Sequence, residues 1–167
     1  MSKLPHTVFV YGTLKKGEPN YHVLNDPKNG SIKFLGIAET METFPLIVAT
    51  QFNIPFALNL PKHGKNIIGE VYSVNDAKLE FMDKLEMHPI LYKRELQRIK
   101  MKETNEEMLA WIYLLETWKD ELLETASEYL TEYSSLGKHG RIFMEKDRRN
   151  KILAEQKLKL FDLIKKV

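Results

Sequence analysis

The sequence predicts an α+β fold in which a mixed sheet curls into a barrel, with a few flanking helices. Several short segments are rich in Val, Ile, Phe and Tyr, which favour strands, and turn residues separate them. One central stretch has a clear helical pattern, and the basic C-terminal stretch is helical again. Many short strands with a single central helix favour this class over regularly alternating β/α units.

The predicted strands share high strand preference and polar or glycine-containing boundaries. They comprise residues 7–11, 32–41, 44–48, 56–60, 67–74, 91–101 and 108–116. Gly36 indicates a bulge or a close backbone approach in the second strand, because glycine in a strand interior marks such irregularities. The polar turn at 102–107 predicts that the last two strands form a hairpin.

The central helix is predicted between Asn75 and Pro89. Asn75 is a favourable N-cap, and the residue before Pro89 resists helical geometry. Leu79, Met82 and Leu85 form its apolar stripe.

Shorter helices are predicted at 19–24 and within 118–133, and the chain is expected to be helical again from residue 147. We expect residues 1–145 to form one domain and residues 146–167 to be a basic helical extension of it. From Arg141 to the end the chain has nine Lys or Arg and four Asp or Glu, whereas the preceding residues are mildly acidic. This extension has three hypothetical roles, namely capping the barrel, binding a partner or having no measurable effect.

The composition excludes several classes of protein. There is no Cys, which removes disulfides and thiolate sites and fits a reducing compartment, so we expect a cytoplasmic protein. No apolar run approaches the roughly 20 residues of a membrane span, and the N-terminus lacks the apolar core of a secretory signal. A net charge of +2 does not indicate nucleic-acid binding. The five histidines are scattered singly, which argues against a metal site.

The first candidate for a binding element is the turn Tyr11, Gly12, Thr13 and Leu14, which follows the N-terminal strand. A buried strand that ends in a glycine turn can present main-chain N–H groups to an anion or a carbonyl oxygen. The alternative, an ordinary turn after a strand, is equally consistent with the spacing.

Glu86 is the candidate acid or base. It follows Met82 by four residues and Leu79 by seven, so it lies on the same side of the helix. The negative end of the helix dipole and partial burial both disfavour its charge, which suits a general base near neutral pH. The alternative is a partly exposed Glu at a helix end. Asp83, one turn earlier, is either a supporting residue or a solvated helix residue.

A set of motifs in a fixed order resembles the gamma-glutamylcyclotransferase-like family, most closely its gamma-glutamylamine cyclotransferase branch. The motifs are residues 8–20 (VFVYGTLKKGEPN), 53–56 (NIPF), 69–72 (GEVY), 82–86 (MDKLE) and 91–94 (LYKR), and less closely 137–140 (GKHG). The similarity covers about residues 7–141.

This resemblance implies a barrel-like mixed fold in which Tyr11–Leu14 cradle the gamma-glutamyl group and Glu86 is the catalytic acid/base. It also implies that neither a metal nor a cofactor is needed. Tyr92 and Asp83 are candidate supporting residues. A contact from a C-terminal tyrosine of the family maps onto Tyr133, within a stretch that matches poorly.

The resulting hypothesis is a monomeric enzyme that converts gamma-glutamyl amines, such as gamma-glutamyl-ε-lysine, to 5-oxoproline and a free amine. Such a lyase or transferase would serve amino acid catabolism and the degradation of crosslinked proteins. Its only expected partner is the small-molecule substrate. Two alternatives remain: a cyclotransferase for another gamma-glutamyl compound, or a non-catalytic binding or regulatory protein that retains the pocket.

Overall fold

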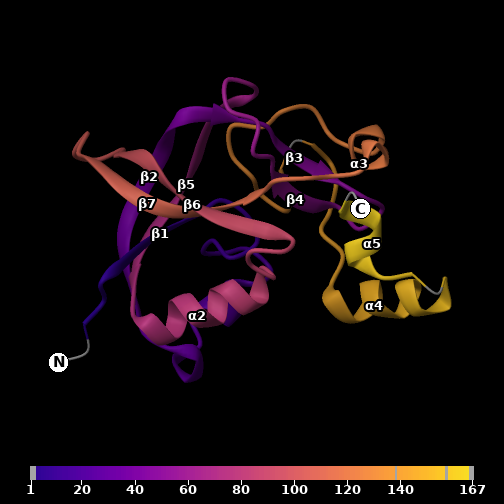
Figure 1. The fold of residues 1–167 in the computed structure, drawn as a ribbon, viewed down its shortest axis with the longest axis horizontal. Helices are drawn as coiled ribbons and strands as arrows, with labels where there is room; N and C mark the ends of the chain where they lie inside the picture. The colour runs from indigo at the N-terminus through magenta and orange to yellow at the C-terminus, as the bar shows by residue number, and fades with distance from the viewer. Residues whose placement is uncertain (1–2, 138, 157, 166–167) are drawn as a thin grey trace.

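Five strands close into a barrel in the order β1-β5-β2-β6-β7 (Figure 1). The computed structural model describes residues 3–137, 139–156 and 158–165. The barrel strands are β1 (His6–Val10), β2 (Ile32–Phe44), β5 (Lys65–Val74), β6 (Tyr92–Met101) and β7 (Glu107–Leu115). Neighbouring strands are antiparallel except for β1 and β7, whose parallel contact at Val8 and Trp111 closes the barrel. The predicted α+β class with a barrel-like sheet is therefore confirmed.

Two further strands, β3 (Leu46–Ala49) and β4 (Ile54–Ala57), form a separate antiparallel pair. The sequence predicted the second of them at 56–60, which is too late in the chain. Pro55 is tolerated within β4, opposite Val48, in a sheet of only two strands. Leu58 leaves this pair and bridges to Leu115 of β7 instead.

The predicted bulge at Gly36 and the predicted hairpin are both present. The pairing of β2 with β5 shifts register between Phe34 and Gly36, and Gly36 has φ +144°, a conformation that side chains rarely allow. Strands β6 and β7 pair continuously from Tyr92 opposite Leu115 to Lys100 opposite Glu107.

The central helix α2 (Asp76–Leu85) begins as predicted but ends earlier than Pro89. The Asn75 side chain accepts hydrogen bonds from Lys78 N at 3.0 Å and from Ser31 N at 3.1 Å, which caps the helix and ties it to β2. Met87 has φ 53°, which turns the chain out of the helix directly after Glu86.

Burial along α2 follows the predicted stripe in part. Leu79 and Met82 are buried, whereas Leu85 is 43% exposed. A residue outside the predicted stripe, Lys78, is fully buried. Its Nζ donates to the main-chain oxygens of Leu24 and Asp26, at the end of the short helix α1 (Tyr21–Leu24) and before the 3₁₀ turn η1 (Pro27–Asn29).

The C-terminal part contains three short helices, α3 (Asp120–Glu124), α4 (Lys146–Glu155) and α5 (Leu160–Ile164). The stretch 118–133 thus has one helix, and the extension breaks into two. Figure 1 shows α4 and α5 on the same side of the barrel as the β3–β4 pair, with α5 nearer to it in this view. Arg141 fastens this segment there, because its guanidinium donates to the main-chain oxygens of Val48 and Thr50 and to Asn53 Oδ1.

None of the helices in the described ranges combines the length and apolar character that crossing a bilayer requires.

Replacing Met82 by Ala should destabilise the fold. The Met82 side chain is 1% exposed and packs in the core between α2 and the barrel, so its truncation leaves a cavity. We expect the free energy of unfolding in urea to fall by about 2–4 kcal/mol. The matched control is Lys84→Ala on the exposed face of α2, with an expected change below about 0.5 kcal/mol. Equal effects of the two substitutions would contradict the packing described here.

Candidate active site

A cavity of about 580 Å³ opens between one end of the barrel, the end of α2, strand β4 and the C-terminal helices. Its wall includes the predicted turn and Glu86, which the fold brings together from positions far apart in the sequence. The other lining residues are mostly aromatic or aliphatic, with polar groups at Asn20, Tyr92, Tyr113, Lys146 and Arg149. This composition is typical of a small-molecule site.

Tyr11–Leu14 form one side of the cavity, directly after β1. Within the described part of the chain, no acceptor takes the main-chain N–H groups of Gly12, Thr13 or Leu14. Gly12 also lies against Pro55, since a Cβ at Gly12 would stand 3.2 Å from Pro55 Cγ. The turn can therefore offer N–H donors to a ligand.

Two side chains hold this turn in place. The buried Glu70 carboxylate accepts hydrogen bonds from Lys16 N at 2.8 Å and from the Tyr72 hydroxyl at 2.9 Å. Asn20 donates from its side chain to Thr13 Oγ1 at 3.0 Å and from its main chain to Thr13 O at 2.9 Å. Glu70 and Tyr72 both belong to the GEVY motif on β5, so that motif supports the turn.

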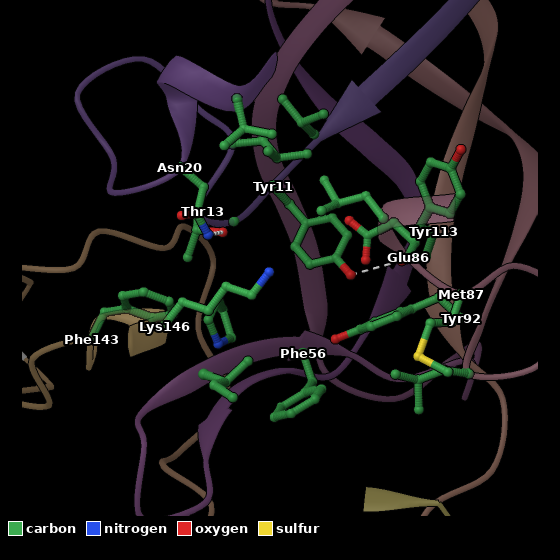
Figure 2. A pocket seen from close by; sticks show the side chains of 18 of the residues that line it. Tyr11, Thr13, Asn20, Phe56, Glu86, Met87, Tyr92, Tyr113, Phe143 and Lys146 are labelled. Carbon is green, nitrogen blue, oxygen red and sulfur yellow. Dashed lines mark hydrogen bonds between the residues drawn. The ribbon is translucent and has the colours of Figure 1, made fainter. Parts of the chain in front are cut away.

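Glu86 lies at the C-cap of α2, with its main-chain N–H bonded to Met82 O at 2.9 Å. Burial among the apolar and aromatic walls raises the pKa of its carboxyl to about 7. Among the described residues, no hydrogen-bond donor reaches this carboxylate. Figure 2 shows it next to the Tyr11 phenol, inside the cavity. A carboxyl group in this state can exchange a proton near neutral pH.

Three tyrosines surround Glu86. Burial first, and the negative charge of Glu86 second, raise the pKa of Tyr11, so its hydroxyl stays protonated. That hydroxyl donates to Tyr113 O at 2.7 Å (Figure 2). The Tyr92 hydroxyl has no hydrogen-bond partner within the described ranges, and its ring stacks on Phe56 at 6.3 Å.

Asp83 lies outside the cavity wall and acts on it through Tyr113. It accepts a hydrogen bond from the Tyr113 hydroxyl at 2.6 Å and pairs with Arg94 Nε at 2.8 Å. Burial by itself would raise the pKa of Asp83, but the hydrogen bonds from Arg94 and Tyr113 and the Arg94 charge outweigh it and lower the pKa. Asp83 is therefore ionised and orients Tyr113.

Tyr133 does not line the cavity. It is fully buried, its ring stacks on His139, and its main-chain oxygen accepts a hydrogen bond from Lys15 Nζ. A substrate contact from Tyr133 stays a prediction from the resemblance, and its position in the barrel core does not favour it.

Sequence reasoning did not single out Tyr113, Asn20, Lys146 or Arg149 as site residues. Tyr113 looks like any aromatic residue of a buried strand. Lys146 and Arg149 are three apart on a helix, which places them on one face, but the sequence has no signal that this face meets the barrel. In the described ranges, no three His, Cys, Asp or Glu side chains cluster as a metal site.

Comparison with known proteins connects this geometry to a family. Residues 8–133 match the family model described as gamma-glutamyl cyclotransferase, AIG2-like. The chain belongs to this family. The match contains both Tyr11–Leu14 and Glu86, and it ends before α4.

Individual proteins of this family are similar to most of the chain. The gamma-glutamylaminecyclotransferase of Bos taurus is 39% identical over 142 residues, which are 85% of this chain and 83% of that protein. Gamma-glutamylaminecyclotransferase B of Danio rerio is 37% identical over 90% of this chain and 79% of its own length. The crystal structure of an AIG2-like protein from Mus musculus superposes with a TM-score of 0.79, at 35% identity, over 85% of this chain and 97% of that one.

Glu86→Gln should stabilise the protein at alkaline pH and leave its stability unchanged in acid. Folding raises the pKa of Glu86 from 4.5 to about 7, so the folded state loses stability as the pH rises from about 4.5 to about 7. Glutamine carries no such penalty, so we expect a gain of about 1–3 kcal/mol in the free energy of unfolding at pH 8 and none at pH 4. Urea unfolding at both pH values measures it, with the exposed Glu80→Gln as control. A gain of equal size at both pH values would contradict the raised pKa.

Proposed function

We propose that this chain is a cyclotransferase that converts gamma-glutamyl amines, such as gamma-glutamyl-ε-lysine, to 5-oxoproline and a free amine. The observation that carries the proposal is the presence in one cavity of a carboxyl group with a pKa of about 7 and a turn with three available N–H donors. Relatives named gamma-glutamylaminecyclotransferase support the choice of substrate class.

In the first step, Glu86 takes a proton from the α-ammonium group of the substrate. An ammonium nitrogen has no free electron pair, so this deprotonation creates the nucleophile. The amine then attacks the γ-carbonyl carbon of the same molecule, and the carbonyl oxygen becomes negatively charged. The N–H groups of Gly12, Thr13 and Leu14 are suited to bind that oxyanion.

In the second step, the carbon–nitrogen bond to the leaving amine breaks as the carbonyl re-forms. Protonated Glu86 gives its proton to the departing nitrogen, and the ring nitrogen loses its second proton to the carboxylate. That proton then passes to the free amine, which leaves as an ammonium ion. The α-nitrogen has lost two protons and the leaving nitrogen has gained two, so the reaction is balanced without water.

Both reacting groups belong to one molecule, so the cavity has to hold the substrate in its cyclising conformation rather than bring two molecules together. The aromatic wall of Tyr11, Phe56 and Tyr92 would restrict the flexible glutamyl chain. The hydrogen bonds from Tyr11 to Tyr113 and from Tyr113 to Asp83 hold part of that wall rigid.

The finer features expected from the sequence stay predictions. They are the role in degradation of crosslinked proteins, independence from cofactors, the cytoplasmic location and the monomeric state. We also propose that residues 146–167 are an extension of the domain formed by residues 1–145, since Ile164 of α5 is buried in the core that contains β1 and α2.

The proposed function predicts that Glu86→Gln abolishes turnover. The purified protein is incubated with gamma-glutamyl-ε-lysine, and 5-oxoproline is measured by chromatography. We expect kcat of the variant to fall by about 10²–10⁴-fold, because Gln cannot accept the proton. Glu80→Gln, on the exposed side of the same helix, should retain full activity. Wild-type protein that forms no 5-oxoproline would refute the substrate class, and an active Glu86→Gln would remove Glu86 from its role.

The pH dependence of kcat/KM tests the state of Glu86 separately. Because the base must be ionised, kcat/KM should fall as the pH decreases below about 7, the pKa of Glu86. Rates from pH 5 to pH 8 measure this limb. A limb centred near the ordinary pKa of a carboxyl group would contradict a buried base.

A further inference from the structure

The C-terminal extension builds part of the cavity wall. Lys146 and Arg149 of α4 and Leu160 and Ile164 of α5 line the cavity together with Phe143. These residues all lie beyond residues 8–133, the part of the chain that matches the family model. The cavity therefore has one wall from the shared family domain and another from the extension.

Arg149 places a guanidinium group on this wall, and none of the described residues pairs with it. Its Nε is buried and makes no hydrogen bond within the described ranges, and none of the ion pairs found there includes it. It lies close enough to Tyr92 for the two groups to affect each other's pKa. A partly buried guanidinium with a buried, unbonded Nε loses hydration without gaining a partner, and a bound anion would supply that partner.

Lys146 adds a second positive charge one helical turn away. Figure 2 shows its amine pointing into the cavity from the side opposite Glu86. Among the described residues, no carboxylate forms an ion pair with Lys146. Arg148 and Lys151 on the same helix are exposed too but, unlike Lys146, do not line the cavity.

The charges in the cavity are thus separated. Glu86 is the only carboxyl group among its described lining residues, and it lies at one side with the turn Tyr11–Leu14. Lys146 extends from the opposite side (Figure 2), and Arg149 lies one turn further along the same helix. A cavity of about 580 Å³ is larger than a five-carbon glutamyl group needs, so it has room for a leaving group that extends toward α4.

Given the proposed function, we propose that Arg149 and Lys146 form a carboxylate-binding subsite for the leaving amine of the substrate. Every substrate of the reaction contains the gamma-glutamyl half, and the family-matched part supplies Glu86 and the turn that handle it. The leaving half is the variable part, and the extension is suited to read it. The chain therefore prefers gamma-glutamyl compounds whose leaving amine carries a carboxylate, as an amino acid does, over uncharged alkylamines.

Two substrates that differ only in this carboxylate test the subsite. Gamma-glutamyl-6-aminohexanoate and gamma-glutamyl-pentylamine share the glutamyl half and an unbranched five-carbon chain on the leaving nitrogen, and only the first ends in a carboxylate. We expect wild-type kcat/KM to be about 10–100-fold higher for the carboxylate compound, the range of a charge-assisted hydrogen-bonded pair. The difference should appear mainly in KM, because the carboxylate is remote from the reacting bond.

Variants locate the preference on α4. Arg149→Gln should reduce the ratio of the two kcat/KM values to within a few-fold of one, Lys146→Gln should reduce it in part, and Arg149→Lys should restore some of it. Arg148→Gln is the matched control, since it removes an exposed charge of the same helix and should leave the ratio unchanged. Thermal melting of each variant checks folding, and Lys146→Gln changes an exposed side chain, so we expect its melting temperature to equal that of the wild type.

The outcomes separate this inference from the proposed function. Formation of 5-oxoproline from both substrates at equal kcat/KM would overturn the subsite alone. If Arg149→Gln lowers kcat/KM equally for both substrates, the cations bind the glutamyl half instead. This result would also overturn the subsite for the leaving amine. A wild-type protein that converts none of the three compounds, including gamma-glutamyl-ε-lysine, would refute the proposed function and with it the subsite.

Discussion

The Glu86 carboxyl lies among the aromatic and aliphatic side chains of the cavity wall, at the point where Met87 turns the chain out of α2. Burial keeps its pKa near neutrality, at about 7. The same burial costs the folded state stability whenever the group is ionised. The rest of the site therefore has to hold an unfavourable group rigidly in place, and the core beneath it, with Met82 fully packed, does so.

Hydrogen bonds between different elements of the fold supply that rigidity on both sides of the cavity. On one side, Asp83 of α2 fixes the Tyr113 hydroxyl, and the Tyr113 carbonyl fixes the Tyr11 phenol. On the other side, Glu70 of β5 fixes the main chain at Lys16, just after the turn. In each network a side chain of one element holds a group of another: Asp83 of α2 holds Tyr113 of β7, and Glu70 of β5 holds the loop after β1. A reaction that depends on holding one molecule in a cyclising conformation benefits from such preorganisation.

The C-terminal helices contribute differently from the barrel. Arg141, which lies between α3 and α4, fastens the chain to the β3–β4 pair. Ile164 of α5 enters the core. Between these two anchors, α4 presents Arg149 and Lys146 to the cavity. The barrel thus carries the groups suited to the chemistry, and the extension carries groups suited to selecting the substrate.

Local patterns in the sequence predicted most of the strands, the bulge at Gly36 and the Asn75 cap. Local patterns and the family resemblance together made Glu86 and Tyr11–Leu14 the candidate site residues. These features depend on residues close in the chain, or on short motifs that resemble those of the family. Tertiary structure alone decided that Lys78 is buried, that Tyr113 and Arg149 reach the cavity, and that Tyr133 does not. The reason is physical. Periodicity shows which face of an element is apolar, but the contacts between polar side chains of distant segments depend on how those segments pack.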